Sequence, residues 1–495
     1  MDYRIKCPYC FAEFSHKDVH FRMESIRTPS HSYQDIELMP DSPERARLME
    51  EYEAAQMFAY KDDEKYEAFW SKYEGIKTER TTNSEWEKFG CEVYQLPVIN
   101  PSSPEGRRVL KSNANNDPFI YDADGMVTAV EDIYGKQTRR RVCPRCHNPI
   151  PLQYGKKRTK FLSVIGVTGA GKTVYISQIL KYMSKYASYV SMASNFCDDH
   201  VNNFIKDNPV EINKPMPAST QEGVLPQPMV YDLTQKNSAD GNSVITDTIV
   251  IYDIAGETCQ DPKKMVEYGD FVTKSDGIIL LVDPSQLNIQ VNYDLNAESK
   301  ASAEPHLVLN TIHNVFTNIK STELCDIPLA VCIPKSDTFE PMLPAEAQRD
   351  ITPLVDQFTE RNKPLFNATE YNIIEPKIRK IIKEELLIAL STRYSNYNFF
   401  VFSATGCDVV KNEDGRFCPE IPPIPKRIAE PLLWMFKKFG YIKADTPIRL
   451  PEPRPLPNPA VVKLPRTFID KLLRRTRTRP MTDAEKEAYK YELTC

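Results

Sequence analysis

One stretch constrains the fold of this chain more than any other: Gly166-Val167-Thr168-Gly169-Ala170-Gly171-Lys172-Thr173. It fits the pattern G-x-x-x-x-G-K-[ST]. The apolar, β-type residues 161–165 precede it, and the helical run 174–180 follows it. A strand that turns through a glycine-rich loop into a helix is the context in which this pattern binds phosphate. The sequence therefore predicts an α/β domain with a nucleoside triphosphate as its ligand.

The residue types of this loop have separate physical roles. Glycines let the backbone turn tightly, so that successive N–H groups converge on a phosphate at the positive end of the helix. Lys172 is expected to reach the β- and γ-phosphates, and the Thr173 hydroxyl to coordinate Mg²⁺. The expected nucleotide-binding residues of the loop are Gly166, Thr168, Gly169, Ala170, Gly171, Lys172, Thr173 and Val174.

A second acidic group is expected at the end of a neighbouring strand, on the Mg²⁺ side of the nucleotide. The buried-type run 248–252 ends in Asp253, and Ile254-Ala255-Gly256 follows. The Gly256 backbone N–H can bind the γ-phosphate and swing away when that phosphate leaves. We place the switch I threonine at Thr220, within the irregular segment 191–247. The predicted catalytic residues are Lys172, Thr173, Asp253, Gly256 and Thr220, with Thr173 and Asp253 as magnesium ligands.

Two further β-type runs end in short polar turns that can recognise a base. Residues 327–333 lead into Pro334-Lys335-Ser336-Asp337, and residues 398–402 lead into Ser403-Ala404-Thr405-Gly406. The Asp337 carboxylate can accept from guanine N1–H and the exocyclic amine together, while the Lys335 stem packs along the base. Adenine has no such donor pair and would leave the carboxylate unpaired, at a cost of about 1–3 kcal/mol or more. The sequence therefore favours GTP and GDP over ATP, with Lys335, Asp337, Ser403 and Ala404 at the base.

Two C-P-x-C pairs predict a metal site at the N-terminal end. Cys7, Cys10, Cys143 and Cys146 match a structural Zn²⁺ site with no open position. The gap between the pairs is longer than usual, so a shared site requires a long insert. Two alternatives remain: separate sites, completed by His16 or His20 and by His147, or redox motifs. We favour one shared site, because a redox pair is expected to open a helix after a strand.

The series G-V-T-G-A-G-K-T, D-I-A-G, P-K-S-D and S-A-T-G resembles the motifs of the translation-factor-related (TRAFAC) class of GTPases. With the cysteine pairs in front, the chain most resembles the bacterial double-GTPase-type domain proteins of that class. The resemblance covers residues from about 161 to about 442, and the cysteine pairs extend it to the N-terminus. It implies a switch that binds GTP with Mg²⁺, hydrolyses it slowly, and serves bacterial signalling or conflict (defence) systems.

Two residues depart from the pattern of these relatives. Pro334 stands where the guanine motif usually begins with Asn or Thr. Glu257 follows Gly256, where many relatives place a water-orienting glutamine. A carboxylate that faces the γ-phosphate orients water poorly, so turnover is expected to be very slow or to depend on a partner. The main alternative to a GTPase is a scaffold that binds the nucleotide without hydrolysing it. A third interpretation is a nucleic-acid-binding zinc protein that GTP regulates.

Composition and charge exclude several classes of protein. The 495 residues are 41% hydrophobic and 26% charged, with a net charge of −5. That charge gives no overall attraction to nucleic acid. The longest apolar run, residues 277–282, is the length of a strand rather than of a membrane span. The N-terminus lacks a signal-peptide core. We therefore expect a cytoplasmic protein without a membrane span.

The predicted architecture is an α/β P-loop domain, a mostly parallel sheet flanked by helices, with an N-terminal split zinc ribbon that carries a largely helical insert. Ser42-Pro43 is expected to begin the helices of the insert, and residues 377–390 to form one amphipathic helix. The expected segments are the first half of the ribbon at 1–28, the insert at 29–136, the second half at 137–158, the GTPase domain at 159–442, and a proline-rich basic tail at 443–495.

Partners beyond the nucleotide are less well defined by the sequence. The insert and the tail are candidate surfaces for a protein partner, and the oligomeric state is open. A basic cluster surrounds the second cysteine pair: Arg139, Arg140, Arg141, Arg145, Lys156, Lys157, Arg158 and Lys160. Basic residues beside a zinc ribbon are compatible with nucleic-acid binding, but a solvated linker face is commoner, and we favour the latter.

Overall fold

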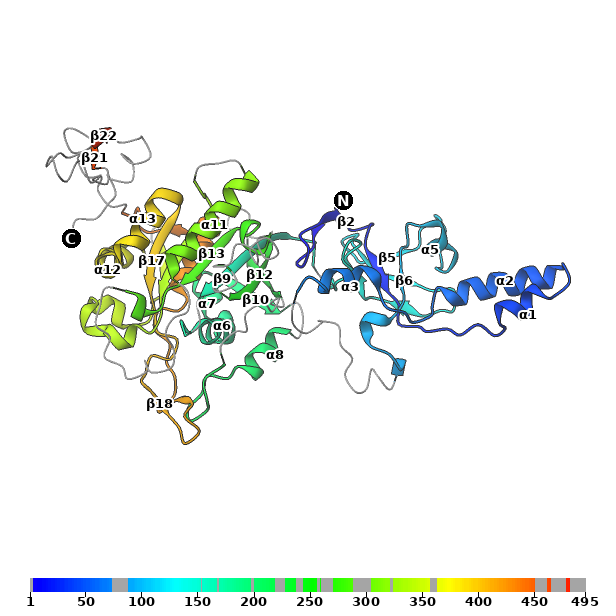
Figure 1. Ribbon diagram of the computed structural model, residues 1–495, viewed down its shortest axis with the longest axis horizontal. Coiled ribbons are helices and arrows are strands. Elements are labelled where there is room, and N and C mark those ends of the chain that lie inside the picture. The colour runs from blue at the N-terminus through cyan, green and yellow to red at the C-terminus, as the bar shows by residue number, and fades with distance from the viewer. Residues whose placement is uncertain are drawn as a thin grey trace, which may run out of the picture.

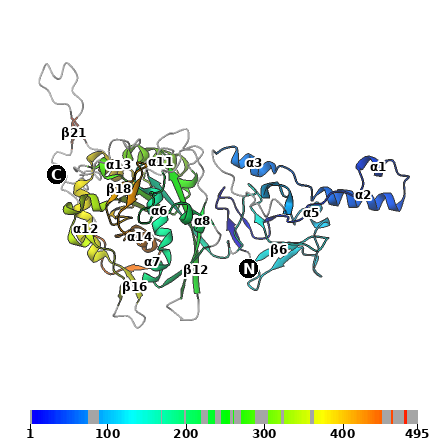
Figure 2. The same cartoon turned by 90° about the horizontal axis from the view of Figure 1, so that it is seen from below.

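The structure is a computed structural model with an elongated shape, in which an N-terminal extension leads away from a sheet-centred domain (Figure 1). The extension ends in α1 (Tyr33–Glu37) and α2 (Pro43–Gln56), at the end farthest from the sheet (Figure 2). Among the described residues, no helix is both long and apolar enough to cross a membrane. The described residues are 3–73, 88–152, 154–166, 169–196, 200–218, 228–236, 244–255, 259, 270–287, 304–320, 324–356, 363–449, 461–463 and 478–480.

A seven-stranded sheet with the order β10-β11-β12-β9-β13-β14-β17 forms the centre of the domain. The run from β12 to β17 is parallel, whereas β10 and β11 are antiparallel at one edge. Strands β13 and β14 are apolar and fully buried, as expected for a parallel sheet covered on both faces. The strands are β9 (Arg158–Gly166), β10 (Met192–Phe196), β11 (Met229–Lys236), β12 (Val244–Ala255), β13 (Gly277–Leu281), β14 (Leu329–Ile333) and β17 (Tyr397–Val401).

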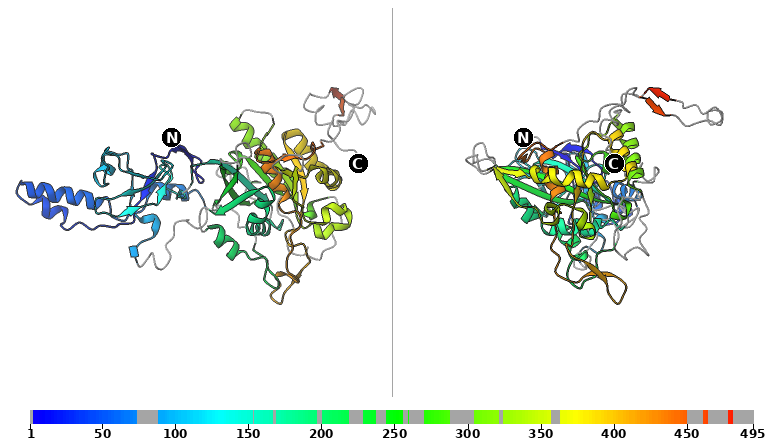
Figure 3. Two further views of the ribbon diagram at one scale, coloured as in Figure 1. Left: turned by 180° about the vertical axis from the view of Figure 1, so that it is seen from behind. Right: turned by 90° about the vertical axis from the view of Figure 1, so that its left-hand side faces the viewer.

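Helices flank this sheet, as the end-on view of Figure 3 shows. They are α6 (Lys172–Lys181), α7 (Met183–Tyr189), α8 (His200–Asp207), α11 (Pro305–Lys320), α12 (Ala368–Ile381), α13 (Glu384–Arg393) and α14 (Glu430–Lys438), with 3₁₀ turns η2 (Pro284–Gln286), η4 (Ser336–Met342) and η5 (Ala345–Gln348). The single helix predicted over residues 377–390 is wrong. Ile382 has the extended backbone angles φ −77° and ψ 139°, so α12 ends there, and the acidic pair Glu384 and Glu385 begins α13.

The extension is a small β-ribbon interrupted by a mixed insert. Its helices include α1, α2, α3 (Glu64–Trp70) and α5 (Pro104–Arg108), with the 3₁₀ turn η1 (Val93–Gln95). The predicted cap at Ser42 is confirmed for α2, because the Ser42 side chain accepts from the Arg45 N–H and Pro43 follows in the first turn. The helices of the insert begin earlier than predicted, however, because α1 precedes α2. The strands are β1 (Arg4–Lys6), β2 (Glu13–Ser15), β3 (His20–Arg22), β4 (Val98–Ile99), β5 (Phe119–Tyr121), β6 (Val127–Glu131), β7 (Gln137–Thr138) and β8 (Arg141–Val142).

Strand pairing across the insert closes the ribbon. β3 lies before the insert helices and β8 after them, yet the two strands pair, with His20 opposite Val142 and Phe21 opposite Arg141. β1 and β2 form a hairpin around the first cysteine pair. The two halves of the ribbon are thus held together although residues 23–140 separate β3 from β8 in the sequence. This pairing brings the two cysteine pairs to the same place.

The C-terminal part adds short strands around the main sheet. They are β15 (Leu354–Asp356), β16 (Lys363–Phe366), β18 (Val409–Lys411), β19 (Phe417–Pro419), β20 (Lys443–Ala444), β21 (Val461–Lys463) and β22 (Thr478–Pro480). β20 pairs with β16, and Asp445 accepts hydrogen bonds from the first N–H groups of α12. Residues 443–449, which the sequence analysis assigned to the tail, therefore lie against the sheet domain.

Candidate functional site

The P-loop lies between β9 and α6, as the sequence pattern predicts. Gly166 ends β9, and the left-handed Gly171, with φ 75°, caps α6. Gly169 is also left-handed, with φ 83°. Side chains other than glycine rarely adopt these angles, so the two glycines permit the tight turn into the helix. Val167 and Thr168 lie outside the described residues. The described part of the loop thus has the backbone conformation that a phosphate-binding turn requires.

Lys172 and Asp253 meet at the phosphate end of the site. Lys172 begins α6, and Asp253 lies near the end of β12, beside Val164 of β9. The Lys172 Nζ is 2.6 Å from Asp253 Oδ1, and their side chains are only 5% and 9% exposed. Thr173, also buried, is the next residue of the helix. The Lys172 ammonium could bind a phosphate oxygen, and the Asp253 carboxylate and the Thr173 hydroxyl could together coordinate a divalent cation. The geometry fits both groups.

The base end of the site begins with Lys335, which joins two loops. Lys335 has the left-handed angle φ 57°, and its Nζ donates to the Gly169 carbonyl oxygen at 2.7 Å. The same Nζ is 2.7 Å from Asp283 Oδ2. Asp283 follows β13, and the sequence analysis did not include it among the site residues. A carboxylate directly after a buried parallel strand was the signal that could have identified it. Lys335 thus joins the turn of residues 334–337 to the P-loop and to the residues that follow β13.

Asp337 provides the observation most relevant to a base. Its Oδ1 is buried and has no hydrogen-bond partner within the described part of the chain. Burial raises the pKa of the Asp337 carboxyl, and a hydrogen bond from the Ser403 side chain opposes that shift. Ser403 also accepts from the Gly406 N–H at 2.8 Å, which holds the S-A-T-G turn in place. Ala404, next to Ser403, is buried. An unpaired buried acceptor is costly unless a ligand supplies a donor.

Several predicted residues cannot be placed. Thr168, Thr220, Gly256 and Glu257 all lie outside the described residues. Their roles remain predictions from the sequence. The described members of the predicted set do come together at the carboxyl ends of β9, β12, β14 and β17, where open α/β sheets bind ligands.

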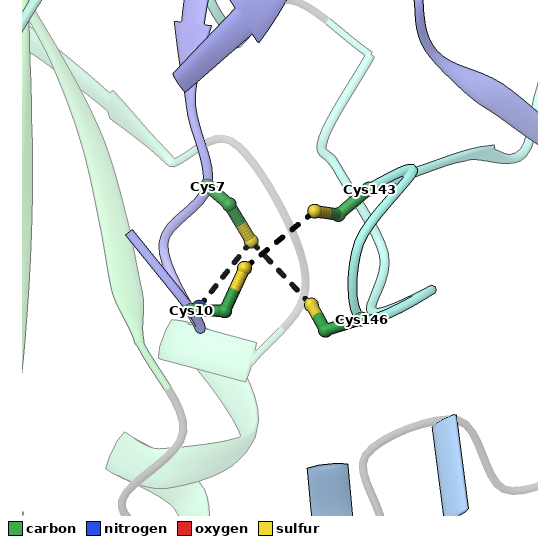
Figure 4. Close-up of side chains that lie close together, drawn as sticks. All are labelled: Cys7, Cys10, Cys143 and Cys146. Atoms are coloured by element: carbon green, nitrogen blue, oxygen red, sulfur yellow. Dashed lines mark hydrogen bonds between the residues drawn. The ribbon is translucent and has the colours of Figure 1, made fainter. Parts of the chain in front are cut away.

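The four predicted cysteine ligands form one cluster (Figure 4). All four Sγ atoms lie within 4.8 Å of one another. Cys7 Sγ is 3.7 Å from Cys146 Sγ, and Cys10 Sγ is 3.6 Å from Cys143 Sγ. Zn–S bonds of about 2.3 Å in a tetrahedron place the sulfurs about 3.8 Å apart. The cluster is therefore compatible with zinc.

The two cysteine turns are near copies of each other. In the first, Phe11 N–H donates to the Cys7 carbonyl oxygen, and in the second, His147 N–H donates to that of Cys143. Phe11 and His147 both have a left-handed backbone, with φ 56° and 50°. Burial raises the pKa of Cys7, whereas hydrogen bonding with Cys143 and its neighbours lowers that of Cys10. Four clustered thiols, three of them buried, cannot all ionise without a compensating cation, and a divalent metal supplies one.

The histidines considered as alternative metal ligands have other partners. His147 Nδ1 is 2.8 Å from Asp63 Oδ1, and its Nε2 is 3.0 Å from His20 Nδ1. Asp63 also pairs with Arg22 at 2.9 Å and caps α3. His16 Nδ1 accepts from the Val127 N–H. This buried network joins the insert to the second cysteine turn. Its residues lie far apart in the sequence, so no sequence motif could have predicted it.

Acidic partners neutralise most of the basic cluster around the second cysteine turn. Arg140 pairs with Glu24, while the buried Arg141 donates to the carbonyl oxygens of residues 127, 151, 152 and 154. The remaining pairs are Lys156 with Asp122 and Asp124, Lys157 with Asp232, Arg158 with Asp247, and Lys160 with Asp276. Cations that are already paired offer little to a phosphate backbone. The ion pairs therefore argue against nucleic-acid binding by this cluster, and they show salt bridges where the sequence predicted a solvated linker face.

Residues 160–415 match the family model described as Double-GTPase 2. No curated protein matches the chain. Among 81 matching chains of solved structures is Sup35 complexed with GDP, at 11% identity and a TM-score of 0.20, covering 50% of this chain and 38% of that chain. Another is the S. cerevisiae Ski7 GTPase-like domain bound to GTP, at 14% identity and a TM-score of 0.25, covering 63% of this chain and 56% of that chain. The match thus spans less than two thirds of either structure.

Proposed function

Because the chain belongs to the Double-GTPase 2 family and is thus a GTP-binding protein, we propose that it acts as a molecular switch that hydrolyses GTP slowly with Mg²⁺. The observation that carries the proposal is the buried Asp337 Oδ1, which has no hydrogen-bond partner among the residues that the structure describes and lies two residues after the lysine that reaches the P-loop. A role in bacterial signalling or conflict, with a protein partner bound through the insert or the tail, extends the proposal and rests on the family resemblance alone.

At the phosphate end, the proposed chemistry is in-line attack of water on the γ-phosphate. The N–H groups of the P-loop and the Lys172 ammonium bind the phosphate oxygens and neutralise the charge that develops on them. Thr173 and Asp253 are the residues that would hold Mg²⁺, which supplies further charge neutralisation when bound. Glu257, a poor residue for orienting water, supports slow turnover.

At the base end, the proposed specificity depends on hydrogen bonding. Guanine offers Asp337 two donors, its N1–H and its amine, whereas adenine offers no such pair. The Asp337 carboxylate is held by Ser403, so it cannot turn to solvent without losing that bond. Adenine would therefore leave a buried carboxylate unpaired. The nucleotide that the site supports best is GTP or GDP.

Calorimetric titration of the purified protein with GDP, a GTP analogue and an ATP analogue, each with Mg²⁺, tests this function. We expect binding of both guanine nucleotides and at least about fivefold weaker binding of the ATP analogue, since one unsatisfied buried group costs about 1–3 kcal/mol. Equal affinity for adenine and guanine nucleotides would contradict the base assignment. Release of phosphate from GTP, measured over hours, tests the proposed hydrolysis.

The pair formed by Lys172 and Asp253 allows a sharper test of the phosphate end. Lys172→Ala is expected to weaken binding of the GTP analogue by about 10- to 150-fold, because a charge-assisted bond contributes about 1.5–3 kcal/mol. It should also destabilise the nucleotide-free protein, since the buried Asp253 is left without its cation. Adding Asp253→Ala should restore much of the stability but none of the affinity. Thermal unfolding and calorimetry of the three proteins measure both effects.

The control for this test is Lys185→Ala, which removes a lysine from α7 that is 46% exposed and pairs with Asp350. We expect that variant to bind nucleotide like the wild type. A Lys172→Ala protein that retains full affinity would show that the ammonium does not contact the phosphates.

A further inference from the structure

The first cysteine turn is packed directly against the strand that carries Asp253. The Tyr252 hydroxyl donates to the Pro8 carbonyl oxygen at 2.7 Å, and Pro8 lies between Cys7 and Cys10. Tyr252 is fully buried, so this bond is protected from water. Because successive residues of a strand point to opposite faces, Tyr252 faces the cysteine turn while Asp253 faces the P-loop. Two consecutive residues of β12 therefore contact the first cysteine turn and the P-loop lysine.

Phe11 extends this contact into an aromatic cluster. The left-handed Phe11, fixed by the turn that positions Cys10, places its ring 5.3 Å from Phe161, 5.9 Å from Tyr252 and 5.1 Å from Phe271. Tyr252 and Phe271 are themselves 5.2 Å apart. The Ser163 hydroxyl donates to the Phe271 carbonyl oxygen at 2.7 Å, which holds Phe271 against β9. The rings are buried and close-packed, so the cluster resists small displacements.

The placement of this cluster in the chain relates it to the nucleotide. Tyr252 precedes the D-I-A-G motif of residues 253–256, and Phe271 follows it. Tyr252, directly before the motif, and Phe271, further along the chain, thus contact the same Phe11 ring of the first cysteine turn. A change in the segment that alters the end of β12 or the position of Phe271 must alter their packing on Phe11. Packed interfaces of this kind shift between discrete arrangements rather than deforming gradually.

We propose that Tyr252 and Phe11 are positioning residues that couple the cysteine cluster to the nucleotide state of the site, a proposal that rests on the proposed function. The first cysteine turn, which zinc would hold when bound, contacts β12 next to Asp253 through Pro8 and contacts Phe271 through Phe11. The ribbon thereby senses whether the γ-phosphate is present. Through the contact between Asp63 and His147, the second cysteine turn of the same cluster leads to the insert.

Reciprocity makes this coupling measurable. If the nucleotide state alters the packing on Phe11, the GTP-analogue complex and the GDP complex must differ in their affinity for zinc. By thermodynamic linkage, zinc must change the ratio of the affinities for the GTP analogue and GDP by the same factor. Couplings between sites in proteins typically change affinity by about 5-fold or more. We therefore expect zinc affinity to differ by at least about fivefold between the two complexes.

The experiment uses the full chain loaded with zinc and saturated with GDP or with the GTP analogue. Competition with a chromogenic zinc chelator at equilibrium gives the zinc affinity of each complex. Tyr252→Phe removes the hydroxyl that contacts Pro8 but keeps the ring, and it is expected to reduce the difference between the complexes to about onefold to twofold. The matched control is Tyr371→Phe, which loses a buried hydroxyl bonded to the Phe399 carbonyl oxygen at 3.0 Å, far along the sheet at β17. That variant should keep the full difference.

Each outcome is informative. Equal zinc affinity in the two complexes of the wild type overturns the coupling but leaves the proposed function intact. A difference that survives Tyr252→Phe, or that Tyr371→Phe abolishes equally, shows that these contacts only stabilise the fold. If neither guanine nucleotide binds, the proposed function fails and the coupling fails with it.

Discussion

Asp337→Asn is expected to lower the affinity for GDP and for a GTP analogue by at least about 100-fold, because two hydrogen bonds to a charged acceptor are lost or reversed. The asparagine amide presents one donor and one acceptor where guanine requires two acceptors. Xanthine has a carbonyl oxygen in place of the guanine amine, so it matches that amide. We therefore expect the variant to bind xanthosine diphosphate better than GDP. Calorimetry with both nucleotides checks the reversal.

The same substitution should not destabilise the nucleotide-free protein. Burial raises the pKa of Asp337, so the folded protein retains a proton at pH values where the unfolded chain has released it. The free energy of unfolding therefore falls as the pH rises through that window, and the loss persists at neutral pH. Asp337→Asn removes this cost. We expect its melting temperature at pH 7 to equal or exceed that of the wild type, and the difference to shrink as the pH is lowered toward about 4.

Asp408→Asn is the matched control for the guanine test. Asp408 is an exposed carboxylate near Asp337, and its charge contributes to the raised pKa of that residue. Its replacement makes the same change in net charge without touching the proposed base contact. GDP affinity should stay the same or rise slightly. A loss of GDP binding in both variants would indicate a general charge effect, and unchanged binding in Asp337→Asn would contradict the base assignment.

Local sequence patterns predicted the sheet domain and the phosphate loop well. The reason is that their determinants are local: buried apolar strands, glycines at left-handed positions, and a helix that starts at Lys172. The pattern at residues 377–390 failed for a local reason too. Its apolar spacing continues through Ile382, but the backbone there turns to an extended conformation. The spacing of apolar residues predicts which face of a helix packs on the core. It does not predict where the helical backbone is interrupted.

Contacts between distant segments could not be predicted in the same way. The bond from Lys335 to Asp283 joins the ends of two strands, and the bond from Tyr252 to Pro8 joins the sheet to the extension. No sequence spacing encodes either contact. The cysteine pairs were recognisable as ligands, but their meeting depends on the pairing of β3 with β8 across the insert. The residue types were enough to predict the cysteines as ligands. Which of them lie together depends on the strand pairing, which the sequence pattern does not give.

Cys143→Ser is expected to abolish zinc binding and to destabilise the extension by several kcal/mol. Serine is a poor zinc ligand, and structural zinc in small finger peptides contributes about 10–16 kcal/mol to folding at neutral pH. In this chain the cluster also fixes the turn that packs Phe11 on Phe161 and Phe271, so its loss should reach the sheet domain. Elemental analysis should find one zinc per wild-type chain and none in the variant. Thermal unfolding should show a lower melting temperature.

The control is Cys91→Ser, which replaces a buried thiol of the insert that lies outside the cluster. This variant should retain one zinc per chain. Its free energy of unfolding should fall only by the cost of replacing one buried sulfur with a hydroxyl. The four sulfurs are close enough to bind one ion together. Two zinc ions per wild-type chain would therefore contradict the shared site. Zinc retained in Cys143→Ser would show that Cys143 is not an essential ligand. Loss of guanine-nucleotide binding in Cys143→Ser but not in Cys91→Ser would show that the cluster supports the Asp253 end of the site through Tyr252 rather than merely completing the ribbon.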